Sequence, residues 1–170
     1  MKIALIIVGV LMLLIVAVVV IGALLPKRHV STRTAQFNAS AEQLFSLVGG
    51  TQTWRTDVAK CEEVTDGGGR HLQRETSVRG ETITYELQDM NPPHSLVRRI
   101  ATPNLPYSGS WSFVFTPAGA GTNVRITEDG EVYNPIFRFV MRFILGETAT
   151  IDAYLKAMGK ATGQDVVPRD

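Results

Sequence analysis

The chain has 170 residues, and its 17 Lys and Arg against 16 Asp and Glu give a formal net charge of +1. This balance provides no overall field that would attract nucleic acid, so we expect no nucleic-acid partner. The single cysteine, Cys61, excludes an intramolecular disulfide and a cysteine-based zinc site, and the three histidines are scattered along the chain. We therefore expect neither a metal nor a cofactor.

An uncharged apolar run occupies residues 3–25 and is interrupted only by Gly9 and Gly22. At about 1.5 Å per residue this run would form a helix of about 35 Å, long enough to cross a hydrocarbon core of about 30 Å. A cleaved signal peptide is the alternative, but its apolar region has about 7 to 15 residues and ends at a small-x-small site. The sequence favours an uncleaved membrane anchor, with residues 1–28 as the anchor and its flanks.

The charges that flank this run bear on its orientation in a membrane. Lys2 precedes the run, whereas Lys27, Arg28 and Arg33 follow it. Because basic residues favour the cytoplasmic side, this asymmetry predicts a single-pass protein whose C-terminal domain is cytoplasmic. The lipid bilayer is then a partner of residues 3–25.

Residues 29–170 have the length of one ordinary domain. Residues 29–38 are rich in β-branched and apolar positions and predict a strand. Ser40 and Gln43 then fit a capping box, and the helix that they begin should end at Gly49-Gly50. A second short helical piece, over residues 51–56, would carry Trp54.

From residue 57 the pattern changes to short alternating runs separated by Gly- and Pro-rich turns, which predicts an antiparallel meander. The six expected strands cover residues 58–64, 72–78, 83–87, 96–101, 109–116 and 122–128. Asn134-Pro135 would then begin a long helix that reaches about Lys160 and is bent at Gly146. The predicted fold class is α+β, with a seven-stranded curved antiparallel sheet wrapped on this helix and a cavity between the two.

Several strings in this order carry a family resemblance. They are Phe37-Asn38-Ala39-Ser40-Ala41-Glu42-Gln43-Leu44-Phe45, Trp54, Asn91-Pro92-Pro93, Gly121-Thr122-Asn123-Val124 and Thr127-Glu128-Asp129-Gly130-Glu131-Val132. Together they resemble the START-like helix-grip superfamily (SRPBCC), in its polyketide cyclase or dehydratase-like branch, over about residues 30–158. The resemblance implies an apolar cavity under the long helix, in a family that mixes lipid carriers, hormone receptors and aromatic cyclases.

The candidate cavity residues come from the short helical piece, from inward-facing strand positions and from one apolar face of the C-terminal helix. They are Trp54, Tyr85, Trp111, Phe113, Ile126, Glu128, Phe137, Val140, Met141, Ile144 and Leu155. Glu128 continues the apolar face of its strand, where Arg74 or Arg98 could be its partner. Simpler interpretations are that the aromatic residues only pack in the core and that Glu128 reaches solvent past the rim of the sheet.

The leading functional hypothesis is a membrane-tethered domain that binds a hydrophobic small molecule, such as a lipid, isoprenoid or polyketide-like compound. The first alternative is a cyclase or dehydratase in which Glu128 acts as acid or base with an Arg or Tyr85. A second alternative is an interaction or assembly module whose cavity is filled by its own side chains. Arg138 and Arg142, four residues apart on the predicted helix, would form a solvated basic edge or contact anionic lipid.

Overall fold

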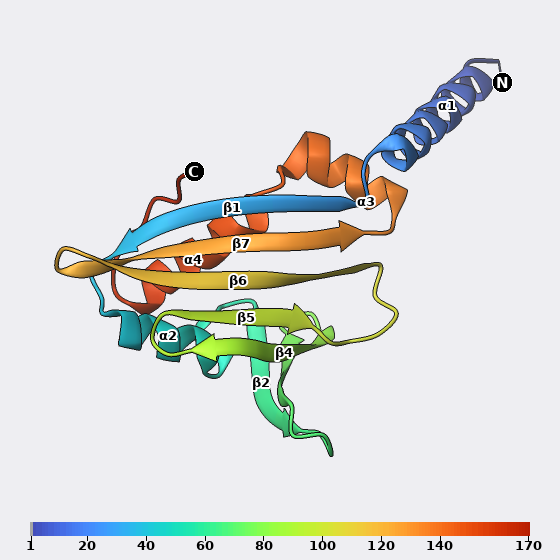
Figure 1. Ribbon diagram of the computed structural model, residues 1–170. Coiled ribbons are helices and arrows are strands. Elements are labelled where there is room, and N and C mark those ends of the chain that lie inside the picture. Colours follow the sequence, from blue (N-terminus) through green and yellow to red (C-terminus); the bar gives the residue numbers. More distant parts are fainter. Residues whose placement is uncertain (1) are drawn as a thin grey trace.

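The structure is a computed structural model that describes residues 2–170 (Figure 1). Its helical elements are α1 (Lys2–Leu24), α2 (Ala41–Gly49), the 3-10 helix η1 (Gln52–Trp54), α3 (Pro135–Val140), the π-helical segment η2 (Met141–Leu145) and α4 (Ala149–Ala161). Its strands are β1 (Arg28–Phe37), β2 (Val58–Thr65), β3 (His71–Ser77), β4 (Thr82–Asn91), β5 (Ser95–Ile100), β6 (Tyr107–Ala118) and β7 (Gly121–Val132). The predicted order of elements is confirmed.

The seven strands form one antiparallel sheet in the order β1-β7-β6-β5-β4-β3-β2. Strands β2 to β7 are a meander, because each pairs with the next strand along the chain, and the first strand pairs with the last. The sheet is curved, with α2 and α4 on its concave side (Figure 1). This arrangement confirms the predicted α+β class and the helix-grip fold.

Helix α2 begins as the sequence predicts. The Ser40 hydroxyl accepts a hydrogen bond from the backbone N–H of Gln43 at 3.3 Å, and the Gln43 side chain accepts one from the Ser40 N–H at 3.1 Å. These two bonds are the capping box, which satisfies backbone donors that the first helical turn leaves free. The helix then buries Leu44 and Val48 completely.

The hydrophobic core lies between the concave face and the two helices. Its strand residues come mainly from β1, β6 and β7, and its helix residues come from α2 and α4. The largest fully buried apolar side chains are Phe37, Leu44, Leu96, Phe113, Phe115, Ile126, Ile151, Leu155 and Met158. This half of the sheet is therefore closed by apolar packing.

The prediction of one C-terminal helix bent at Gly146 is wrong in one respect, because in the structure this helix is divided into two parts. Asn134 caps α3 through its side-chain oxygen, as the Asn134-Pro135 pair predicts. The helix then loosens into η2 and ends at Gly146, whose φ of +85° lies in the left-handed region that favours glycine. Only the second part, α4, covers the sheet, and α3 contacts α1 instead.

Helix α1 is long and apolar enough to cross a membrane, and it extends away from the sheet (Figure 1). Most of its side chains are exposed, but Gly22 near its end is buried against α3. A Cβ atom at this position would overlap the carbonyl oxygen of Pro135, so glycine is required for the close approach of the two helices. The contact fixes α3 beside the end of the apolar helix.

Candidate ligand-binding site

The concave face has an apolar half and a polar half. On β3 the two buried residues are Gln73 and Glu75, which lie two positions apart and therefore share one face. On β5 the buried positions are Leu96 and Arg98. Polar side chains from β3 and β5 thus occupy the half of the concave face that lies away from β1 and β7.

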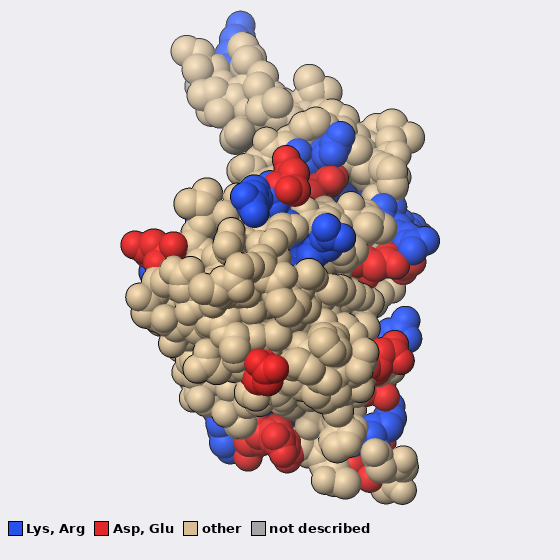
Figure 2. Space-filling view, turned by 60° about the vertical axis from the view of Figure 1, so that its left-hand side comes forward, with Lys and Arg blue, Asp and Glu red and all other residues tan. Residues whose placement is uncertain are grey.

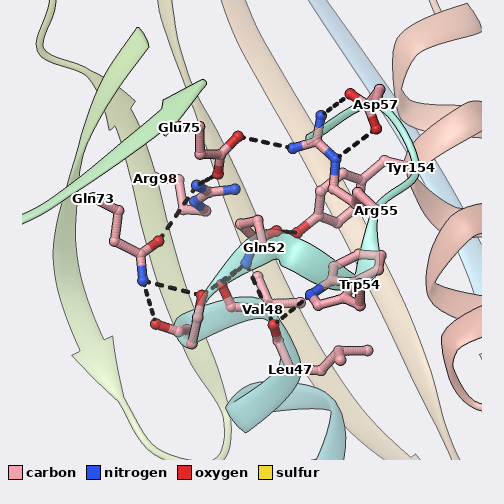
Figure 3. Close-up of polar contacts among 12 residues, drawn as sticks. Leu47, Val48, Gln52, Trp54, Arg55, Asp57, Gln73, Glu75, Arg98 and Tyr154 are labelled. Atoms are coloured by element: carbon pink, nitrogen blue, oxygen red, sulfur yellow. Dashed lines mark hydrogen bonds and ion pairs between the residues drawn. The ribbon is translucent and has the colours of Figure 1, made fainter. Parts of the chain in front are cut away.

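Arg98 and Glu75 form a buried ion pair at the centre of the polar half (Figure 3). Each side chain is only 6% exposed. Glu75 also accepts a hydrogen bond from Arg55 at 3.1 Å, and Arg55 in turn pairs with Asp57 at the rim. The result is a chain of four charges of alternating sign that runs from the interior to the surface, in which each charge has an opposite neighbour.

Aromatic rings surround these charges. The Arg98 guanidinium lies 4.6 Å from the centre of the Tyr85 ring, and that of Arg55 lies 5.4 Å from the centre of the Tyr154 ring. Both distances are within the range of cation–π contacts. Tyr154 also meets Trp54 and Trp111 edge-to-face, at 5.4 and 5.3 Å between ring centres. The site therefore combines buried charge with flat apolar walls.

Gln52 and Gln73 connect this site to the end of α2. The Tyr154 hydroxyl donates to Gln52 Oε1 at 2.8 Å, and Gln52 Nε2 donates to the Val48 carbonyl oxygen at 2.8 Å. Gln73 Nε2 donates to the carbonyl oxygen of Gly49 at 2.8 Å. Because these amides use the free carbonyls of the helix end, they fix the geometry of the site.

One donor in the site has no partner among residues 2–170. Arg98 uses Nη2 for Glu75 and Gln73, but its Nε–H is buried and makes no hydrogen bond. A buried donor without an acceptor is costly, so an oxygen atom brought by a ligand would be stabilised at this point. The same residues contain no group of three His, Cys, Asp or Glu side chains arranged to hold a metal ion.

The phenols of the site should titrate late. Burial is the main cause that raises the pKa of both Tyr85 and Tyr154 to about 12. The unfolded chain ionises its tyrosines near pH 10. The folded state therefore keeps these two protons longer, and stability that is complete below pH 10 should fall as the pH rises toward 12.

Phenolate absorbance measured during an alkaline titration of the native protein checks this expectation. Of the four tyrosines, Tyr85 and Tyr154 should ionise last or only on unfolding. In Tyr85→Phe one late phenol should disappear while the early ones remain. Ionisation of all four tyrosines near pH 10 in the folded state would contradict the assignment.

Six of the predicted cavity residues gather at this site or in the adjoining core. Trp54, Trp111 and Tyr85 surround the charged chain, while Phe113, Ile126 and Leu155 are fully buried beside it. In the structure these side chains contact one another and their neighbours, and their role as walls of a ligand cavity remains a prediction.

Glu128 faces the concave side, as predicted, but it does not pair with an arginine, so the predicted pairing is wrong. Its Oε1 lies 3.7 Å from His29 Nε2, and its Oε2 accepts from the Thr150 hydroxyl at 3.4 Å. Arg98 pairs with Glu75 instead, and Arg74 lies on the exposed face of β3. The cause is the strand order: Glu128 on β7 and Arg98 on β5 lie at the same level of the sheet, but β6 separates them, and Trp111 of β6 pairs with both positions.

The four predicted residues from the first part of the C-terminal helix do not cover the sheet. Phe137 and Val140 belong to α3, and Met141 and Ile144 belong to η2. Phe137 is 50% exposed and Ile144 is 67% exposed. The prediction that they cover the cavity from the helix side is wrong, because the chain breaks at Gly146 and this segment contacts α1 instead.

Sequence reasoning missed the residues that make the site polar: Gln52, Arg55, Gln73, Glu75 and Tyr154. A signal was present in β3, where polar residues at positions 73 and 75 share one face. The expectation that inward positions are apolar concealed it. No local pattern indicates that Arg55 and Tyr154 reach the same place, because they come from distant segments of the chain.

Two hollows lie outside this site. One, of about 160 Å³, is formed on the sheet by Thr34, Val114, Thr116, Asn123 and Arg125. The other, of about 240 Å³, lies where α1 joins the domain and is lined by residues of the 25–29 segment, Val132, α3, η2 and Glu147.

A sheet of seven antiparallel strands that grips a C-terminal helix defines a START-like (SRPBCC) domain. Residues 28–161 match the family described as "Polyketide cyclase / dehydrase and lipid transport". The chain therefore belongs to this family.

Solved structures of low sequence identity share the fold. Norcoclaurine synthase from Thalictrum flavum is 16% identical, with a TM-score of 0.57 over 78% of this chain and 85% of that one. Protein Ms6760 from Mycobacterium smegmatis is 17% identical, with a TM-score of 0.53 over 79% and 88%. Ara h 8.0201 is 13% identical, with a TM-score of 0.56 over 81% and 99%. No curated protein sequence matches the chain.

Proposed function

We propose that the protein is a membrane-anchored START-like domain that binds a hydrophobic small molecule between the sheet and α4. The ligand classes that fit are a lipid, an isoprenoid or a polyketide-like compound. The family description, which names lipid transport, and the apolar helix α1 support this proposal. By the positive-inside rule the domain lies on the cytoplasmic side.

The unpartnered Nε–H of Arg98 is the observation that carries the proposal. A ligand with one oxygen acceptor would meet this donor, while its apolar body would lie against the rings of Tyr85 and Trp111. Because Trp111 and Tyr154 are in contact, the ligand must part these rings to enter. Entry from the polar half is favoured, because Tyr85 is partly exposed there.

Native mass spectrometry of the full-length protein in detergent, combined with solvent extraction, tests the proposal. We expect about one apolar, oxygen-bearing molecule per chain. Arg98→Lys keeps the positive charge beside Glu75 but lacks Nε, so it should bind an apolar fluorescent probe with a carboxylate more weakly than the wild type. Arg99→Lys, on the exposed neighbouring position, is the matched control. An empty protein that also takes up no probe would overturn the proposal in favour of an interaction module.

An enzymatic function is the second candidate, and the environment of Glu128 favours it. The Glu128 carboxylate lies 3.7 Å from His29, and both side chains are less than one-fifth exposed, at 19% and 18%. A carboxylate beside an imidazole can take up and return a proton during a reaction. Turnover of an extracted compound that is lost in Glu128→Gln, with binding retained, would establish this function. Binding without turnover would exclude it.

A further inference from the structure

The junction between α1 and the domain contains the larger of the two hollows. The side chains that line it include four cations, Lys27, Arg28, Arg138 and Arg142, and one anion, Glu147. Arg28 is paired with Asp129 at 2.7 Å and Arg142 with Glu147 at 3.0 Å. Among residues 2–170 no ion pair neutralises Lys27 or Arg138. Figure 2 shows Lys and Arg side chains, with Asp and Glu side chains among them, at the end of the domain from which α1 protrudes.

Arg138 is the most constrained of these cations. Arg138 is only 8% exposed, and its Nη1 donates a hydrogen bond to the carbonyl oxygen of Leu25 at 2.6 Å. Its Nε is buried and has no hydrogen-bond partner in the described chain. A buried guanidinium with a free donor and no carboxylate is suited to an anionic oxygen, because its fork of N–H groups matches a phosphate.

The helical segment beside this hollow exposes an apolar surface. The residues that form it are between 47% and 67% exposed, and they are Ile136, Phe137, Phe143, Ile144 and Leu145. This segment begins at Pro135, which touches Gly22 in the last turn of α1. The exposed apolar side chains therefore lie at the level where a membrane-spanning α1 would leave the hydrocarbon core.

We propose that residues 135–145 form a second membrane-contacting element and that the adjoining hollow binds the phosphate of an anionic phospholipid. The apolar side chains enter the acyl boundary, and Arg138 and Lys27, the two cations without an ion-pair partner in the described chain, hold the headgroup phosphate. This inference rests on the proposed anchoring by α1, but it does not depend on what the concave face binds. It also does not depend on which side of the membrane the domain occupies.

The test uses the full chain in nanodiscs of phosphatidylcholine mixed with phosphatidylglycerol. After release into detergent, native mass spectrometry counts the phospholipid that each chain retains. We expect phosphatidylglycerol to be retained in preference to phosphatidylcholine. Because one basic residue near a membrane surface contributes about 1 kcal/mol, Arg138→Gln and Lys27→Gln should each reduce this preference roughly fivefold. Arg79→Gln, in the exposed β3–β4 turn, makes the same change of charge and should have no effect.

Hydrogen exchange provides a second measurement that does not alter the buried Arg138. In nanodiscs residues 135–145 should exchange more slowly than in the detergent-solubilised chain, and Ile144→Ser should reduce this protection. A chain that stays in the nanodisc but shows neither lipid preference nor protection would overturn the inference and leave the anchor intact. Loss of the chain from the nanodisc would overturn both this inference and the proposed anchoring by α1. Displacement of the retained lipid by millimolar inorganic phosphate would show a free-anion site and would also overturn the inference.

Discussion

The Glu75→Gln variant is expected to lose about 3–5 kcal/mol of unfolding free energy, the usual cost of breaking a buried ion pair. The substitution leaves Arg98 charged in an interior position, where its remaining contacts are the ring of Tyr85 and the weak 3.4 Å hydrogen bond to Gln73. It also removes the carboxylate that bridges Arg98 to Arg55. An amide can accept a hydrogen bond but cannot balance two guanidinium charges.

Urea unfolding of the detergent-solubilised chain, followed by tryptophan fluorescence, measures this loss. Glu63→Gln on the exposed side of β2 makes the same chemical change and should alter the unfolding free energy by less than about 0.5 kcal/mol. The double variant Glu75→Leu with Arg98→Met should recover most of the stability, because apolar groups of similar volume replace such pairs at little cost. A loss below about 1 kcal/mol in Glu75→Gln would show that the pair is hydrated, since exposed pairs contribute that little.

This expected recovery bears on function. If an apolar pair can replace Arg98 and Glu75 without loss of stability, stability alone does not explain why the concave face carries them. The free Nε of Arg98 and the ring of Tyr85 above its guanidinium fit the recognition of a polar ligand group. The double variant therefore separates the two roles, since it should fold and yet fail to bind.

The fold could be predicted because its signals are local. Alternation marks each strand, Ser40 with Gln43 marks the start of α2, and Asn134-Pro135 marks the start of α3. The division of the last helix was harder to predict from the sequence, because Gly146 permits either a bend or a full break. The contact of Gly22 with Pro135 favours the break, and that contact joins residues more than a hundred positions apart.

The candidate site could be predicted only in part, because its polar members depend on strand register and on loop position. Alternation correctly places Trp111 and Phe113 on the concave face. It cannot show that Arg98 lies near β3 rather than near Glu128, since this depends on the order of strands in the sheet. Arg55 reaches Glu75 only because η1 turns the chain across the end of α2.

The Phe113→Ala variant should lose about 3–5 kcal/mol of unfolding free energy, as large-to-small changes of buried aromatic residues do. Phe113 is fully buried, and its ring centre lies 5.6 Å from that of Tyr154 and 6.2 Å from that of Trp111. The space that it leaves adjoins the proposed ligand site, so a small apolar probe such as benzene should bind the variant more tightly than the wild type. Urea unfolding with and without benzene measures both effects.

Ile126→Val, a neighbouring change, should cost only about 0.5–1.5 kcal/mol and leave benzene binding unchanged. Equal losses in the two variants would show that the core collapses into the gap, and an unchanged benzene affinity would show that this space does not open toward the site.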